Sequence, residues 1–236
     1  MLSEETPKTW VFRNFVNSFH YLYQDAEYLH NAAQRGATVR SFEQTKLCRT
    51  ALILYILSLE GLINRACDHF LPEPLRGLFL KSEDRFSLED KCWLLCAGGA
   101  KKSASEIDKS RYPWSHFSEL VQMRNDFVHP KHDRAAYYRA ISAHRWEPLP
   151  WNEIPKGLGV KEKEVVYRQS RIPKDPYAIG LAHLEEVKRI INDTVAELDR
   201  LLGGRVLSSN WSTNDQMVLI YPRTAKLTDL PADPQT

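Results

Sequence analysis

Apolar residues recur every three or four positions in several stretches of the chain, which is the spacing that places them on one face of an α-helix. The first stretch follows Thr6-Pro7, a capping residue followed by proline at the first helical position, and reaches Gly36, a natural stop. Its apolar positions are Trp10, Phe15, Phe19, Leu22, Ala26, Leu29 and Ala33. The spacing predicts a helix that begins at Pro7 and ends just before Gly36.

A second and longer apolar pattern begins at Ser41, where Gln44 three residues later completes a capping box. It continues to about Phe70 and is closed by Pro72 and Pro74. Between residues 51 and 63 almost every side of this helix is apolar. A helix without a polar face is surrounded by others, so we expect it at the centre of the fold.

Three further helices are expected, over residues 87–97, 115–129 and from Asp175-Pro176 to about residue 202. The region between Pro130 and Asp175 contains four further prolines, and within it the segment VVYRQSR is a candidate strand. After Gly204 the chain has one apolar run, MVLIY, and then PADPQT. The pattern predicts an all-α domain over residues 1–204 with an irregular insertion at 131–174, in which a short strand pair is expected. A loosely structured tail over 205–236 follows.

Composition and charge place few constraints on function. Of the 236 residues, 43% are hydrophobic and 26% are charged. The net charge of the chain is only +2, so its overall charge does not indicate a nucleic-acid partner. The opening MLSEETPKTW lacks a secretory pattern, and the longest apolar run is too short to span a membrane. Four cysteines without a CxxC pair are typical of reduced, buried thiols, and no metal or cofactor is expected. The expected location is cytoplasmic, without a membrane partner.

One arginine interrupts the apolar pattern of the helix at 115–129. On a helical wheel Arg124 falls in the middle of the apolar arc. The arc consists of Phe117, Leu120, Val121 and Val128, with Phe127 at its border. A buried unpaired charge is costly, and Glu60 interrupts the central helix in the same way, so we expect the two to pair or to share a polar pocket. In the alternative, Glu60 pairs with Arg65 or another surface group, and Arg124 reaches solvent.

His129 follows Arg124 by five residues, which on an ideal helix turns the two side chains about 140° apart. The residue before a proline is disfavoured in the helical region, and Pro130 puts His129 in that position. We therefore expect the helix to unwind at His129. The imidazole would then be free to turn toward Arg124 or toward a second subunit.

The arrangement of Arg124, Asn125 and His129 late in a helical bundle resembles the Arg-polar-x-x-x-His motif of the HEPN superfamily, and the segment LILYILSLEGLINRA is similar to its apolar central helix. The superfamily includes toxins, phage-defence ribonucleases and RNA-processing factors. The resemblance implies an up-down helical bundle that dimerises and sets two motifs around one cleft. It also implies metal-independent RNA cleavage. Two other pairs, Arg111 with His116 and Arg139 with His144, share the spacing but lack the asparagine and the apolar arc.

The chemistry that the resemblance implies suits these residue types. RNA supplies its own nucleophile, the 2′-hydroxyl, and the product would be a 2′,3′-cyclic phosphate. His129 would transfer protons, and Arg124 would stabilise the charge of the transition state. Asn125 would hold the histidine or the phosphate, and Glu60 would orient the arginine.

Basic and aromatic residues just beyond the motif are weaker candidates for RNA contacts. They are Lys131, His132, Arg134 and Tyr138. The alternative is a solvated charged loop. The partners expected for the whole protein are RNA, a second copy of the chain that completes a composite active site, and an antitoxin or nucleotidyltransferase. The other function consistent with the sequence is a non-catalytic helical module that binds RNA, nucleotide or a protein partner.

Overall fold

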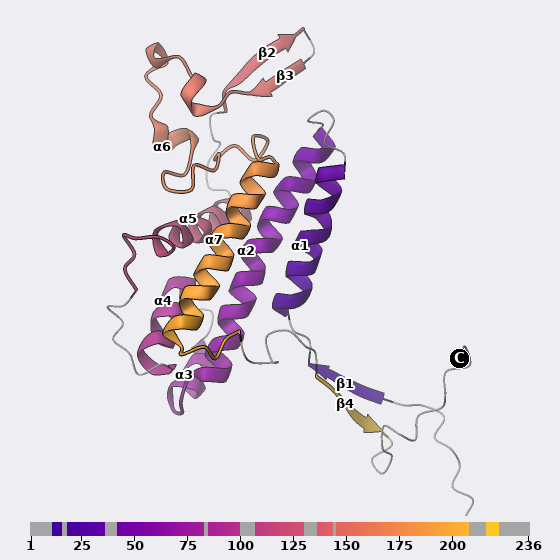
Figure 1. Ribbon diagram of the computed structural model, residues 1–236, viewed down its shortest axis with the longest axis vertical. Coiled ribbons are helices and arrows are strands. Elements are labelled where there is room, and N and C mark those ends of the chain that lie inside the picture. The colour runs from indigo at the N-terminus through magenta and orange to yellow at the C-terminus, as the bar shows by residue number, and fades with distance from the viewer. Residues whose placement is uncertain are drawn as a thin grey trace, which may run out of the picture.

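The computed structural model describes residues 11–15, 18–35, 42–82, 85–99, 107–129, 136–143, 145–207 and 216–221. The chain is mostly helical, as the apolar spacing predicts. Three long helices lie side by side along the long axis of the molecule (Figure 1). They are α1 (Ser18–Arg35), α2 (Phe42–Phe70) and α7 (Leu181–Leu201).

Shorter helices complete the bundle. They are α3 (Leu75–Ser82), α4 (Leu88–Leu94), a π-helical turn (Leu95–Gly99) and α5 (Trp114–Val128). Both α4 and α5 pack against α2, and α5 also contacts α7. The helix predicted over 87–97 is confirmed, because Ser87 caps α4 and exchanges side-chain and backbone hydrogen bonds with Asp90. Helix α3 was not predicted, and α5 begins at Trp114, one residue before the expected cap.

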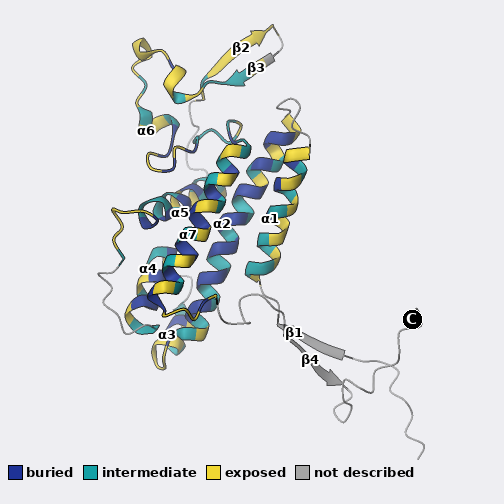
Figure 2. Ribbon diagram, viewed as in Figure 1, coloured by how far each residue is buried: buried dark blue, intermediate teal, exposed yellow. Residues whose placement is uncertain are grey.

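Helix α2 forms the centre of the fold, as expected (Figure 2). Its side chains Leu52, Ile56, Leu59, Leu62 and Ile63 are each at most 1% exposed. By length and composition α2 is, among the described helices, the one that could cross a membrane. Here neighbouring helices cover its apolar residues, which is the situation of a core helix.

A polar network joins α1, α2 and α7 inside the bundle. The Tyr55 hydroxyl donates to Glu27, whose carboxylate lies 2.9 Å from the Lys188 ammonium. His30 contacts the Tyr55 hydroxyl through Nδ1 at 3.1 Å and Glu185 through Nε2 at 3.1 Å. Burial raises the pKa of Glu27, but the hydrogen bonds from Tyr55 and Lys188 outweigh it and hold that pKa below its ordinary value. Each buried polar group of the network thus has a partner.

The predicted start of the first helix is wrong. Residues Val11–Phe15 form strand β1, which pairs antiparallel with β4 (Gln216–Tyr221), and α1 begins only at Ser18. The segment VFRNF is rich in β-branched and aromatic residues, and the apolar run MVLIY near the other end of the chain supplies its backbone hydrogen bonds. Strand β4 thus lies within residues 205–236, for which a loosely structured tail was expected. The predicted cap at Thr6-Pro7, the stop at Gly36 and the segment PADPQT lie outside the described residues.

The insertion contains the expected strand pair, although not at the segment VVYRQSR. Strands β2 (Tyr138–Ser142) and β3 (Arg145–Pro148) form an antiparallel hairpin that projects beyond the bundle (Figure 1). Two 3₁₀ turns (Trp151–Glu153 and Lys156–Leu158) and the short helix α6 (Glu162–Val165) follow. In VVYRQSR the structure has a single isolated bridge, from Val166 to Pro173.

Two carboxylates of α5 attach the insertion to the bundle. Glu119 accepts the backbone N–H groups of Gln169 and Ser170, each at 2.8 Å. Asp126 accepts the hydroxyl of Tyr167 at 2.7 Å. The insertion therefore packs on the same helix that carries the Arg-polar-x-x-x-His motif.

The last helix begins later than predicted. The side chain of Asp175 accepts the backbone N–H of Tyr177 at 2.9 Å, and the backbone carbonyl of Asp175 accepts the N–H of Ala178 at 3.0 Å. The residues expected to form the first turn of the helix therefore form a turn that is separate from α7. Helix α7 then starts after Gly180. Its predicted end is confirmed, because Gly203 and Gly204 adopt φ values of 71° and 77°, which suit glycine beyond a helix end.

Candidate functional site

Arg124 of α5 and Glu60 of α2 form an ion pair, as the sequence predicts. Arg124 Nη2 donates to Glu60 Oε1 at 3.0 Å, and its distance to Oε2 is also 3.0 Å. The two side chains are 29% and 23% exposed. The alternative, in which Arg124 reaches solvent without contacting Glu60, is wrong.

The position of Arg124 on α5 differs from the helical-wheel prediction. The buried face of α5 is formed by Trp114, Phe117, Leu120 and Met123. Val128, which was placed in the apolar arc, is 47% exposed. Met123 rather than Arg124 therefore lies at the centre of the buried face. Arg124 lies at its edge, where one end of the guanidinium is covered and the other can meet an anion.

The guanidinium has unused hydrogen-bonding capacity. It carries five N–H donors. Nη1 donates to the Asn125 side-chain oxygen at 2.8 Å and Nη2 to Glu60, whereas the buried Nε–H has no acceptor in the described part of the chain. Asn125 thus contacts the arginine directly. Because the Nε–H is fully covered, a further acceptor would have to meet the guanidinium at Nη1 or Nη2.

A pocket of about 410 Å³ opens beside this pair, between α2, α4 and α5. Its apolar wall includes Ile56, Leu88 and Val121, and its cations are Arg85, Lys91 and Arg124. Glu60 is the one carboxylate among the described lining residues, and Asn64, Ser87 and Asn125 add neutral polar groups. The lining thus carries an excess of positive charge, which favours an anionic ligand.

His129 ends α5 as predicted. Its φ of −127° and ψ of 69° lie outside the helical region, while its backbone N–H still donates to the carbonyl of Asn125 at 2.8 Å. The residue is exposed and does not line the pocket at Arg124. Within one chain the imidazole has therefore not turned into that pocket. An approach to a second subunit stays a prediction.

Of the four weaker candidates for RNA contacts, the structure describes Tyr138. Lys131, His132 and Arg134 lie outside the described residues. Tyr138 lies on β2, is 38% exposed, and its hydroxyl donates to Asp175 at 2.7 Å. It thus belongs to the projecting hairpin and takes part in holding the insertion together.

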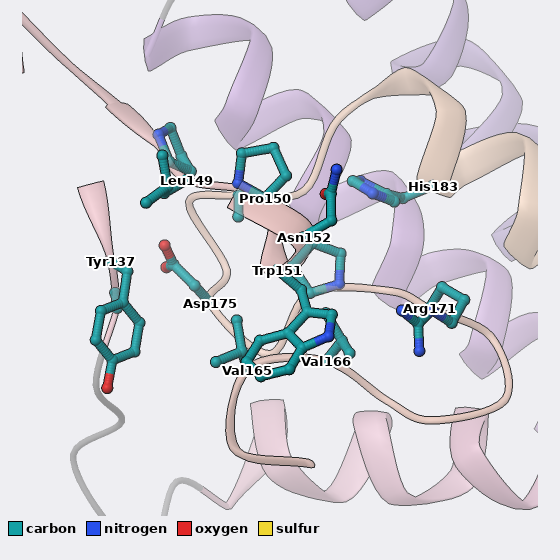
Figure 3. Close-up of a pocket in the computed structure, with 14 residues that line it drawn as sticks. Tyr137, Leu149, Pro150, Trp151, Asn152, Val165, Val166, Arg171, Asp175 and His183 are labelled. Carbon is teal, nitrogen blue, oxygen red and sulfur yellow. The ribbon is translucent and has the colours of Figure 1, made fainter. Parts of the chain in front are cut away.

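The insertion forms a second cavity of about 290 Å³ that the sequence did not predict (Figure 3). Its walls include Trp151, Val165 and Val166, and its polar groups include Asp175 and His183. Asp175 already accepts from Tyr138 and from a backbone N–H, and His183 accepts the N–H of Gly180 at 3.0 Å. These contacts fix the loops of the insertion, and no catalytic grouping follows from them.

Metal-ligand groupings are absent from the described part of the chain, where no three His, Cys, Asp or Glu side chains gather closely enough to hold an ion. All four cysteines are buried and free of disulfides. Burial, with the nearby thiols Cys67 and Cys96, raises the pKa of Cys92 well above its ordinary value, so this thiol is not an activated nucleophile. No family model, curated protein or solved structure matches the chain, so the function must be argued from the geometry of the site.

Proposed function

We propose that the protein is a metal-independent endoribonuclease of the HEPN type that acts as a homodimer in toxin or phage-defence biology. The observation that carries the proposal is the contact of Arg124 with both Glu60 and Asn125 at the rim of a cationic pocket. The same helix ends at His129, which is exposed. A fixed cation and a nearby titratable group are the two elements that cleavage of RNA without a metal requires.

The proposed reaction uses the 2′-hydroxyl of the RNA as nucleophile. Its oxygen forms a bond to the adjacent phosphorus, and the bond from phosphorus to the 5′-oxygen breaks. One His129 accepts the proton of the 2′-hydroxyl, and a protonated His129 of the second copy donates a proton to the leaving 5′-oxygen. Arg124, held by Glu60 and Asn125, donates to the phosphoryl oxygens as their charge grows.

The dimer is part of the proposal because a single chain leaves His129 outside the pocket. Two copies that meet at the ends of their α5 helices would surround one RNA phosphate with both motifs. An antitoxin or nucleotidyltransferase that blocks this cleft is the expected regulatory partner.

A non-catalytic binding module is the second candidate, and the exposure of His129 away from the pocket favours it. In that case Arg124 and Glu60 form a structural ion pair, and the pocket binds RNA, nucleotide or a protein partner without cleaving it. The two candidate functions differ in whether the protein cleaves RNA and whether removal of the His129 imidazole abolishes that cleavage.

An RNA cleavage assay in EDTA separates them. We expect wild-type protein to produce 2′,3′-cyclic phosphate ends and to leave a 2′-O-methyl substrate intact. His129→Ala and Arg124→Ala should each lose at least about a hundredfold in rate. The matched controls are Arg111→Ala and His116→Ala, which have the same sequence spacing and should cleave normally. Cleavage that survives both His129→Ala and Arg124→Ala, or that requires a divalent ion, would refute the proposal.

A further inference from the structure

Lys91 of α4 is a buried cation in the pocket beside Arg124. The residue is 5% exposed and lines the pocket. Its ammonium donates to the side-chain oxygen of Asn64 at 2.8 Å and lies 5.7 Å from the ring centroid of Phe79. Neither of these partners carries a negative charge.

The nearest carboxylates along α4 are engaged elsewhere. Glu89 accepts from the Lys109 ammonium at 2.7 Å, and Asp90 accepts from the Ser87 hydroxyl at 2.6 Å. Among the residues that the structure describes, no carboxylate forms an ion pair with Lys91. An ammonium has three donors and a full charge, so one amide oxygen leaves most of its capacity unused. Burial of such a group is costly unless a counter-charge is supplied.

Lys91 and Arg124 each donate a hydrogen bond to a side chain of α2. Glu60, which holds Arg124, and Asn64, which holds Lys91, are four residues apart and lie on the same side of the helix. Four residues of helix rise about 6 Å, a separation similar to that of consecutive phosphates along a nucleic-acid strand. The described lining residues include three cations and one carboxylate, an excess of two positive charges that two phosphodiester groups would neutralise.

We propose that Lys91 and Asn64 form a second phosphate subsite, which holds the phosphate adjacent to the one at Arg124. The phosphate-binding chemistry stands on the pocket alone, whereas the identification of the ligand as an RNA strand depends on the proposed function. Lys91 is a positioning residue: it fixes the strand so that the neighbouring phosphate meets Arg124.

The first test uses Lys91→Met, which keeps the length of the side chain and removes its charge. The probe is a single-stranded 2′-O-methyl oligoribonucleotide, which cannot be cleaved, with binding followed by fluorescence anisotropy over a range of salt concentrations. We expect affinity to fall about tenfold and the dependence of log affinity on log salt to decrease by roughly one phosphate contact. Lys109→Met removes a lysine whose ammonium pairs with Glu89 outside the pocket, and it should bind as wild type does.

A second variant, Asn64→Asp, keeps the hydrogen bond to Lys91 and supplies the missing negative charge. It should weaken oligonucleotide binding to a similar extent without lowering the melting temperature. A purely structural role for Lys91 predicts the opposite pattern, in which Lys91→Met lowers the melting temperature and leaves affinity unchanged. Wild-type affinity in both Lys91→Met and Asn64→Asp would overturn the subsite.

The source of the phosphate is distinguished by a separate measurement with inorganic phosphate. A phosphate-dependent rise in the melting temperature of wild type, reduced in Lys91→Met, supports the subsite even if no RNA is cleaved. In that outcome the nuclease proposal fails and the ligand is a free phosphate or nucleotide. If RNA is cleaved but Lys91→Met changes neither KM nor oligonucleotide binding, the nuclease proposal stands and the subsite fails.

Discussion

The ion pair between Arg124 and Glu60 allows a quantitative separation of structural and catalytic roles. The perturbation is a double-mutant cycle of Arg124→Ala, Glu60→Gln and the two together. A structural pair predicts that the loss of either partner acts mainly on the free energy of unfolding. A catalytic arginine predicts that Arg124→Ala acts mainly on the rate of cleavage.

The expected magnitude follows from the exposure of the pair. Fully exposed pairs contribute about 0.2–1 kcal/mol, and removal of one partner of a fully buried pair costs about 3–5 kcal/mol. Side chains that are 29% and 23% exposed lie between these limits, and solvent can hydrate the partner that remains. We therefore expect Arg124→Ala to destabilise the fold by about 1–2 kcal/mol, with a coupling energy of about 1 kcal/mol. For a chain of this size that corresponds to a fall in melting temperature of roughly 3–6 °C.

The assay combines urea denaturation with RNA cleavage on the same preparations. Loss of one charged contact in the transition state lowers the rate about 10²–10³-fold, which is much more than the small unfolded fraction of Arg124→Ala explains. Arg76→Ala is the matched control, because Arg76 pairs with Asp68 at 2.9 Å and both side chains are nearly half exposed. This variant should lose less than about 1 kcal/mol and no activity.

Two results would refute this reasoning. Destabilisation by Arg124→Ala of more than about 3 kcal/mol, matched by Glu60→Gln, would identify a structural pair. Cleavage by folded Arg124→Ala at the wild-type rate would show that the guanidinium does not act on the transition state. Either result would leave the binding module as the better candidate.

Four other expectations can be measured on the same protein. Glu27→Gln should lower the melting temperature at neutral pH, because the pKa of Glu27 is held below its ordinary value in the folded state. That stabilisation is fully present above the unfolded pKa, so the difference between the two proteins should shrink as pH falls through the lowered pKa of the folded state. Ser87→Ala should cost about 1 kcal/mol in urea denaturation through loss of the cap of α4. Glu119→Ala should speed limited proteolysis of the insertion while the bundle melts within a few degrees of wild type, because two backbone N–H groups lose their acceptor. Light scattering should show a dimer, and wild type mixed with an excess of His129→Ala should lose activity as mixed dimers form, because both His129 side chains act in one cleft; a strict monomer would contradict the shared cleft.

The helices that the sequence predicted well are those whose signals are local. Helix α2 has apolar residues on most sides, and α4 has a serine cap, so both could be placed from neighbouring residues. Strand β1 could not, because its partner β4 lies about two hundred residues away and local periodicity contains no information about it. The start of α7 was missed for a different reason: the signal is local but ambiguous, since the side chain of Asp175 forms a turn with the backbone of Tyr177 instead of capping a helix.

The candidate site was predictable where a charge interrupts an apolar pattern. Glu60 follows the apolar run of α2 and Arg124 borders the apolar face of α5, and a partly buried charge favours a partner of opposite sign, so their contact could be expected from the sequence. Lys91 gave no such signal, because it follows Asp90 in a polar segment that is typical of a solvated helix face. Its burial depends on how α4 packs against α2, which is a tertiary property.

The charge distribution of the pocket links these observations to a reaction. A pocket built only to stabilise the fold would pair each buried cation with a carboxylate, because an unpaired charge weakens the native state. Among the described residues Glu60 pairs with Arg124, while Lys91 has a neutral acceptor and no carboxylate partner. Under the proposed function this arrangement would lower stability in the empty pocket and regain it when an anion binds. Since the same cations would interact still more strongly with a phosphate that gains charge in the transition state, a pocket that binds RNA in the proposed way would also favour its cleavage.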